Sequence, residues 1–182
     1  GDLDLVVGVE TGAVWYANDG SGTFGASTEI CLCHDDGATG TRALNLSDVD
    51  ADGDLDVFFA PATPGTSPVQ GWYENNGSGS FTERSLDTVE LTANVAVPLD
   101  YDGDGDQDLL FTFDEETDGS TGSVSVYENS NNSFNRVDLE TDGAGHWSIV
   151  PADFDGDGDM DLAVSTTEST VSSGHLTFRQ ML

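Results

Sequence analysis

Short apolar runs alternate with polar loops along the whole chain, and no segment of ten or more residues shows helical periodicity. Each run is rich in β-branched and aromatic residues, which favours strands. A first group precedes a conspicuously acidic stretch and a second group follows it. The first group is "RALNLSDVD", "NVAVPLDYD" and "WSIVPADFD", and the second is "DLVVGV", "DVFFAPA", "DLLFTFD" and "DLAVST".

A third kind of segment alternates polar and apolar residues and contains Asn, Gly and Ser, which predicts a hairpin. It occurs as "GAVWYANDGSGTF", "QGWYENNGSGSF" and "GSVSVYENSNNSF", and "GHLTFRQML" has only its first strand. Four antiparallel strands in about 50 residues describe a blade of a β-propeller. We therefore predict an all-β partial propeller over residues 1–182. Its segments are a partial blade at 1–41, blades at 42–92 and 93–145, and a partial blade at 146–182.

The acidic stretch "DYDGDGDQDLLF" at 100–111 has an aspartate at every second position from Asp100 to Asp108. On a strand these carboxylates would share one face and repel. Gly103 and Gly105 indicate a loop instead. Such a loop brings its carboxylates together around something positive.

Oxygen ligands at positions 1, 3 and 5, a glycine at 6 and a backbone carbonyl at 7 are typical of a calcium loop. Asp100, Asp102 and Asp104 occupy positions 1, 3 and 5. An EF-hand ends with Glu at position 12, but Phe111 stands there, and Asp108 at position 9 is the last acid. Because an apolar run follows, we predict a calcium loop between two strands.

The same loop recurs at 48–59 and 153–164, and the chain begins with the second half of a further copy. The equivalent glycines are residues 1, 53, 105 and 158, which is a regular repeat. The predicted metal residues are Asp2 and Asp4; Asp48, Asp50, Asp52, Asp54 and Asp56; Asp100, Asp102, Asp104, Asp106 and Asp108; and Asp153, Asp155, Asp157, Asp159 and Asp161.

The formal net charge is −31, with four arginines and no lysine. This charge disfavours nucleic acid as a partner, because a phosphate backbone needs basic contacts. No apolar run approaches the roughly 20 residues of a membrane span. The chain has no initiator Met and no signal-like start, so we expect a piece of a longer protein. A merely solubilising acidic surface is the alternative interpretation of the charge.

Segments such as "ADFDGDGDMDLAV" and "VWYANDGSGTF" resemble the FG-GAP/VCBS repeats of integrin-α-type propellers, and the resemblance covers essentially the whole chain. It implies calcium ligation by the side chains at positions 1, 3, 5 and 9 and by the carbonyl at position 7. Asp54, Asp106 and Asp159 would then give backbone oxygen, and their carboxylates would only add to the field. Such propellers usually have seven blades, so fourteen strands would make about half a ring.

Secretion is expected from the calcium loops, because extracellular modules bind calcium at ~10⁻⁴–10⁻³ M. Sequons at Asn45, Asn76 and Asn131 are compatible with it. Cys31 and Cys33 are too close for an ordinary disulfide without strain. They are interpreted as loop thiols or as pairing with a missing segment, and a soft-metal site with His34 would lack further ligands.

The sequence favours a protein without catalytic activity. His34, His146 and His175 lie in different repeats, and none is near a nucleophile motif such as GxSxG. The alternative is an accessory propeller of a secreted polysaccharide-degrading enzyme. A thrombospondin-like calcium rod needs denser motifs and many cysteines. A dockerin needs a helix after the loop, where this chain has apolar strands.

The expected function is adhesion or binding of a protein or carbohydrate at the extracellular or cell surface. We expect the ligand on the face opposite the calcium loops, because the connections there differ most between repeats. Trp72, His146 and Trp147 are the exposed candidates, although these connections could also be simply unconstrained. The remaining blades would come from the rest of the chain or from a second copy.

Overall fold

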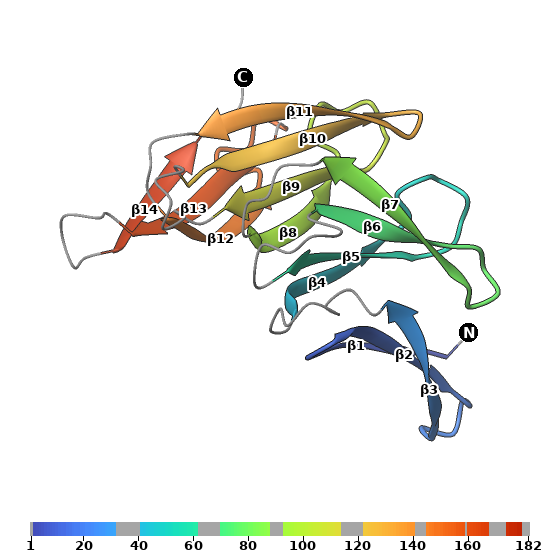
Figure 1. Ribbon diagram of the computed structural model, residues 1–182. Helices are drawn as coiled ribbons and strands as arrows, with labels where there is room; N and C mark the ends of the chain where they lie inside the picture. Colours follow the sequence, from blue (N-terminus) through green and yellow to red (C-terminus); the bar gives the residue numbers. More distant parts are fainter. Residues whose placement is uncertain are drawn as a thin grey trace. The chain divides into compact units, whose positions relative to one another are not determined.

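The computed structural model describes residues 2–31, 41–61, 70–87, 93–113, 122–140, 145–158, 160–167 and 174–179. These residues form fourteen strands in four antiparallel sheets, and no helix (Figure 1). Within the described residues no helix could span a membrane. The chain forms two compact units, residues 1–90 and 91–182, and each is described by itself.

The N-terminal unit holds the first and second sheets. The first sheet has the order β1-β2-β3, and the second has the order β4-β5-β6-β7. In each, neighbours in sequence are neighbours in the sheet, as in a meander. The strands are β1 (Leu5–Val9), β2 (Gly12–Asn18), β3 (Phe24–Cys31), β4 (Thr41–Ser47), β5 (Asp56–Pro61), β6 (Gln70–Asn75) and β7 (Phe81–Asp87).

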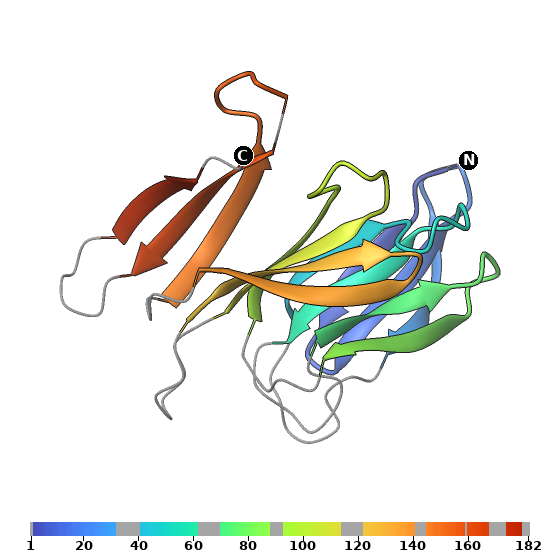
Figure 2. The same ribbon diagram turned by 90° about the horizontal axis from the view of Figure 1, so that it is seen from above.

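The C-terminal unit repeats this plan with the third sheet, β8-β9-β10-β11, and the fourth, β12-β13-β14. Figure 2 shows the meander of the same strands from above. The strands are β8 (Ala93–Leu99), β9 (Asp108–Phe113), β10 (Val124–Ser130), β11 (Ser133–Glu140), β12 (Gly145–Ala152), β13 (Asp161–Thr167) and β14 (Gly174–Arg179). The predicted all-β partial propeller of antiparallel four-stranded repeats is confirmed, whereas the exact blade boundaries stay predictions.

Apolar side chains from two successive sheets form the core of each unit. In the N-terminal unit, Ala13 and Ile30 of the first sheet pack with Val57 and Tyr73 of the second. The core of the C-terminal unit combines β8–β10 residues with β12–β13 residues: Leu99, Leu110, Val124, Val126, Ile149, Leu162 and Val164. The alternation along the strands thus buries one face of each sheet against its neighbour.

The hairpins between the third and fourth strands differ in length. In the first two sheets a five-residue turn is closed by a backbone bond, from Asp19 N to Thr23 O (3.0 Å) and from Asn76 N to Ser80 O (3.1 Å). In the third sheet Asn131 and Asn132 alone make the turn, with φ of 53° and 64°. Two successive residues with positive φ define a type I′ turn, which suits asparagine.

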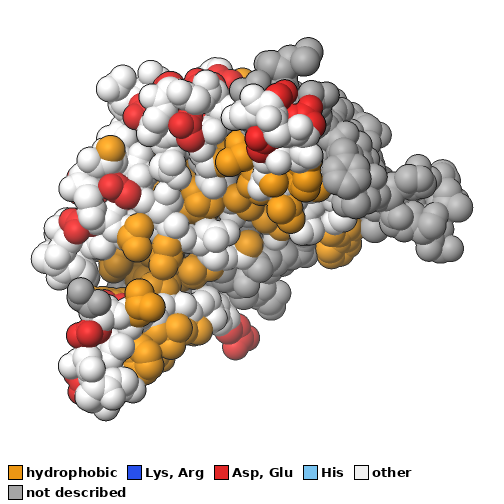
Figure 3. Space-filling view, turned by 180° about the vertical axis from the view of Figure 1, so that it is seen from behind, with side chains coloured by type: hydrophobic (Ala, Val, Ile, Leu, Met, Phe, Trp, Pro, Cys, Tyr) orange, Lys and Arg blue, Asp and Glu red, His pale blue; other side chains and the backbone are white. Residues whose placement is uncertain are grey.

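Acidic side chains and exposed hydrophobic side chains lie close together on one face of the described surface (Figure 3). Large apolar residues that remain exposed include Leu3, Leu55, Trp147, Val150 and Phe154. Cys31 is disulfide-bonded, so its interpretation as a loop thiol is wrong. Cys33 lies outside the described residues.

Candidate metal centres

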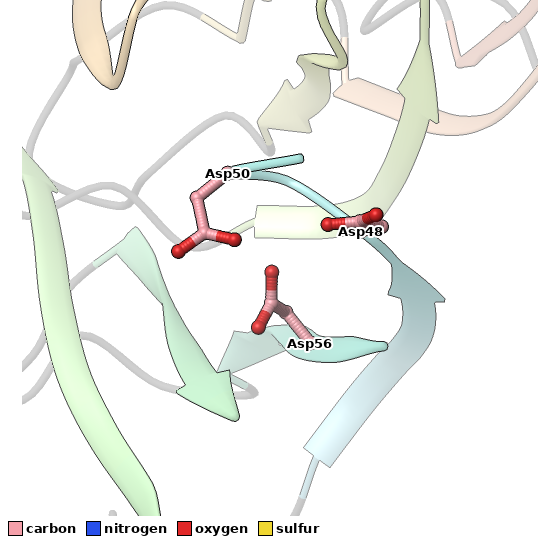
Figure 4. A group of neighbouring side chains, drawn as sticks. All are labelled: Asp48, Asp50 and Asp56. Atoms are coloured by element: carbon pink, nitrogen blue, oxygen red, sulfur yellow. The ribbon is translucent and has the colours of Figure 1, made fainter. Parts of the chain in front are cut away.

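Three groups of three aspartates converge at the loops between the first and second strands of the second, third and fourth sheets. They are Asp48, Asp50 and Asp56; Asp100, Asp102 and Asp108; and Asp153, Asp155 and Asp161. In each group one oxygen from every carboxylate lies within 4.8 Å of the others. Figure 4 shows the first group, whose carboxylates point toward a common space. The structure therefore brings positions 1, 3 and 9 together three times.

The position 9 carboxylate is the buried anchor of each group. Asp56 is the first residue of β5 and is 0% exposed. Its Oδ2 accepts a hydrogen bond from Val49 N (2.9 Å), and its Oδ1 accepts one from Asn75 N (2.8 Å). These bonds join the loop to the end of the third strand.

The third and fourth sheets repeat this anchoring. Asp108 accepts from Tyr101 N and from Asn129 N, both at 2.7 Å. Asp161 accepts from Phe154 N at 2.9 Å. Position 9 is therefore held in the same way by the second residue of its own loop in all three repeats.

In the second and fourth sheets, the position 1 carboxylate accepts hydrogen bonds from backbone N–H groups later in its own loop. Both oxygens of Asp48 accept backbone bonds, from Asp52 N and Gly53 N, each at 3.0 Å. Asp153 does the same with Gly156 N (2.6 Å) and Gly158 N (3.1 Å). The glycine at position 6 has a φ of 97° at Gly53, a left-handed value that favours glycine.

Positions 3 and 5 shape the loop by bonding two residues ahead. Asp50 Oδ1 accepts from Asp52 N (3.3 Å), and Asp52 Oδ1 accepts from Asp54 N (2.9 Å). Asp102 and Asp104 make the equivalent bonds in the third sheet. The position 5 aspartates, Asp52, Asp104 and Asp157, are outside the three-carboxylate groups, so their role as ligands stays a prediction.

The position 7 side chains do more than add to the field, which corrects the expectation from the resemblance. Asp106 Oδ2 accepts a hydrogen bond from Asn131 N (3.2 Å) in the hairpin turn of the third sheet. The Asp54 carboxylate lies against Gly77 in the equivalent turn. The ligand pattern that the resemblance implies does not predict this contact, because the pattern describes the loop without the neighbouring hairpin. Asp159 lies outside the described residues.

The half loop at the start of the chain is anchored in the same manner. Asp4 Oδ1 accepts from Asn18 N (2.8 Å), and Asp4 Oδ2 accepts from Trp15 Nε1 (3.1 Å). Asp2 lies beside Gly20 of the first hairpin turn. Asp2 and Asp4 belong to none of the three carboxylate groups, so their role as ligands stays a prediction.

In the first three sheets, an asparagine that the sequence predicts only as a turn residue links the acidic loop to the hairpin. Asn75 Nδ2 donates to Leu55 O (3.1 Å), and its Oδ1 accepts from Gly77 N (3.1 Å). Asn18 and Asn129 make the corresponding bonds in the first and third sheets. The signal in the sequence is the recurring Tyr-x-Asn at the end of the third strand.

Burial and mutual repulsion act on these carboxylates. Burial raises the pKa of Asp56 to about 6, although the N–H groups of Asn75 and Val49 act to lower it, and Asp50 and Asp52 add repulsion. The pKa of Asp108 is raised for the same first cause, as is that of Asp50. A bound cation would relieve both costs.

The donor set fits a hard divalent cation. Every side chain in the groups offers carboxylate oxygen, the ligand that calcium prefers. Asp100 Oδ1 is buried and makes no hydrogen bond, and a buried carboxylate oxygen without a partner is costly. A cation held by Asp100, Asp102 and Asp108 would supply that partner.

The fold and the repeated loops define a class: an all-β repeat module whose blades carry an acidic loop between their first two strands. The model of the FG-GAP-like repeat matches residues 1–59, 48–111 and 100–164. The chain therefore belongs to the FG-GAP-like repeat family. No curated protein matches the chain.

Of the two residues expected to be exposed on the face opposite the acidic loops and described by the structure, one is buried and one is exposed. Trp72 is only 4% exposed, so its assignment as an exposed contact residue is wrong. Trp72 lies on the inner strand β6, where it pairs with Phe58 of β5 and with Arg84 of β7. Trp147 is 53% exposed, as expected. The side chain of His146, together with residues His34 and 62–69, lies outside what the structure describes.

Proposed function

We propose that this chain is a calcium-binding module of an extracellular protein. The single observation that carries the proposal is the repeated convergence of three aspartates, one of which is a buried carboxylate that accepts backbone hydrogen bonds. Calcium would supply positive charge where the chain is most negative. Three such ions would change the formal net charge from −31 to −25.

Calcium removal tests this proposal directly. At ~1 mM calcium and a Kd of ~10⁻⁴ M, each site would add roughly 1.4 kcal/mol to the free energy of unfolding. Three sites would add about 4 kcal/mol, a large share of a domain's typical ~5–15 kcal/mol. We expect differential scanning calorimetry to show a clear drop in Tm in EDTA, reversed by calcium and not by zinc. An unchanged Tm would contradict the proposal.

An extracellular location agrees with this range of affinities, because such loops would be largely empty in cytosol. Asn76 and Asn131, two of the sequon residues, lie exposed in hairpin turns, where a glycan could be accommodated. FG-GAP repeats are generally structural modules without catalysis, which favours a binding role. An accessory propeller of a secreted polysaccharide-degrading enzyme is the alternative.

We propose adhesion to a protein or carbohydrate through the connections opposite the calcium loops. These connections vary strongly between repeats, whereas the loops and the first two hairpin turns hardly vary. Grafting another sequence into 61–70 should change ligand preference with little change in Tm. Asp104→Ala should lower Tm and should reduce ligand affinity only through unfolding. If Asp104→Ala abolished binding in a folded protein while the graft left it intact, calcium itself would belong to the ligand site.

A further inference from the structure

A cavity of about 560 Å³ opens between the first and second sheets of the N-terminal unit, at the end that carries the acidic loops. Val6 and Trp15 of the first sheet and Val57 and Phe81 of the second line it and also take part in the core between these sheets. This volume is in the range of small-molecule sites, about 300–1,000 Å³. The cavity is therefore large enough for a side chain or a small organic ligand.

The walls are apolar and partly fixed. Trp15 Nε1 donates to Asp4 Oδ2 (3.1 Å), which orients the indole. The far edge of the ring approaches Gly79, where an added Cβ would lie 2.7 Å from Trp15 Cζ3. Leu46 and Leu55 line the cavity from the second sheet, and they are 41% and 57% exposed. An oriented aromatic ring and exposed leucines favour a ligand with an apolar body.

The cavity is also lined by three acidic residues, Asp2, Asp4 and Asp54. None of the described residues that line the cavity is Lys, Arg or His. Among the described residues, the Asp4 carboxylate accepts hydrogen bonds from two neutral groups, the Trp15 indole and the Asn18 backbone N–H. An anion would be repelled here, and a purely apolar ligand would desolvate the carboxylates without pairing them.

We propose that this cavity binds an organic cation: an ammonium or guanidinium group on a small hydrocarbon body, such as a lysine or arginine side chain of a partner protein. The hydrocarbon packs against Leu46 and Leu55, and the cation faces the carboxylates and the Trp15 ring. This goes beyond calcium binding, because it uses the side chains of Asp2, Asp4 and Asp54, which are outside the three carboxylate groups.

The test uses the full chain in saturating calcium with benzylammonium as the probe. Its neutral and anionic analogues, benzyl alcohol and benzoate, have similar size. NMR titration follows the Trp15 Nε1–H signal, which Trp15→Phe identifies by its loss. We expect saturable binding of benzylammonium at least about tenfold tighter than of benzyl alcohol, a difference of about 1.4 kcal/mol. Benzoate should not bind.

Two variants and a matched control locate the site. Asp54→Asn should weaken probe binding by up to about fivefold, the effect of one exposed ion pair. Leu55→Ala should weaken it without removing charge. Glu83→Gln removes the same charge from the exposed part of β7 and should leave binding unchanged.

Several outcomes would overturn the proposal. Equal binding of benzyl alcohol would show an apolar pocket without charge recognition, and binding of methyl α-glucoside instead would assign the cavity to carbohydrate. An equal loss of probe binding in Glu83→Gln would show that the probe responds only to the general negative charge of the chain. Displacement of the probe by added calcium would assign these carboxylates to metal. Absence of saturable binding would also refute it.

Discussion

Asn75 and Asn129 each connect the acidic loop of a repeat to the hairpin turn of the same repeat. The backbone N–H holds the position 9 carboxylate, the side-chain amide holds the loop carbonyl, and the side-chain oxygen holds the hairpin turn. Only an amide side chain offers both donor and acceptor at this reach. These residues therefore fix the orientation of the buried carboxylates Asp56 and Asp108 without belonging to the carboxylate groups.

Replacing this amide should reduce both stability and metal affinity. Asn75→Ala removes two side-chain hydrogen bonds and leaves Leu55 O and Gly77 N without these partners, which we expect to cost about 1–3 kcal/mol. Calcium titration by calorimetry should show weaker binding at one site of three. Asn135→Ala is the control, because that side chain makes only a 3.4 Å contact with Glu128. Identical calcium isotherms for Asn75→Ala and the native chain would remove this role.

At the scale of elements, the acidic loop and the hairpin turn of one blade are in direct contact. Asp54 lies against Gly77, Asp106 accepts from Asn131 N, and Asp2 lies beside Gly20. The turn residues that meet these carboxylates all have positive φ. The two segments on this end of the blade therefore have to fit each other.

Two glycine substitutions separate backbone strain from this fit. Gly77→Ala and Gly22→Ala both place alanine at a left-handed φ, which costs about 1–2 kcal/mol. Only at Gly77 would the new Cβ collide with a carboxylate, that of Asp54, whereas Gly22 has open space around it. We expect Gly77→Ala to lower Tm more and to weaken calcium binding as well. Equal Tm shifts with unchanged calcium affinity would show that the turn and loop are independent.

The sequence predicted the elements well because each signal was local. Aspartates at every second position with a glycine at position 6 defined the loops, and the apolar run after Asp108 defined β9. Contacts between segments were harder to predict. The sequence predicts Asn75 only as a turn residue, because the loop carbonyl that its side chain reaches is 20 residues away and is not part of the local pattern. Trp72 is expected at the surface because it stands beside a variable connection, but the burial of its side chain depends on packing that the local pattern does not contain.

At the scale of the whole molecule, the first and fourth sheets have three strands each in the described residues, whereas the second and third have four. The fourth sheet also leaves Trp147, Val150 and Phe154 about half exposed. Unpaired strand edges and exposed apolar side chains favour association with further strands. We therefore propose that the remaining blades come from the rest of the protein or from a second copy.

Sedimentation of the isolated chain tests this proposal. We expect self-association that increases with protein concentration in calcium, because exposed apolar surface is buried on contact. Trp147→Ser should shift the equilibrium toward monomer, while Asn135→Ala, on the exposed part of β11, should not. A stable monomer with a compact closed shape at all concentrations would contradict the proposal.

The bond between Asp56 and Asn75 also constrains the order in which the protein can mature during synthesis. The two residues are 19 positions apart, and the equivalent pair, Asp108 and Asn129, is 21 apart. A nascent chain that has released the five aspartates of a loop still lacks the N–H group that closes the site. Each site therefore matures only after its own hairpin has been translated. A product terminated between Asp56 and Asn75 would keep the acidic loop but lack this closure, so that the Asp56 carboxylate would be held by Val49 N alone.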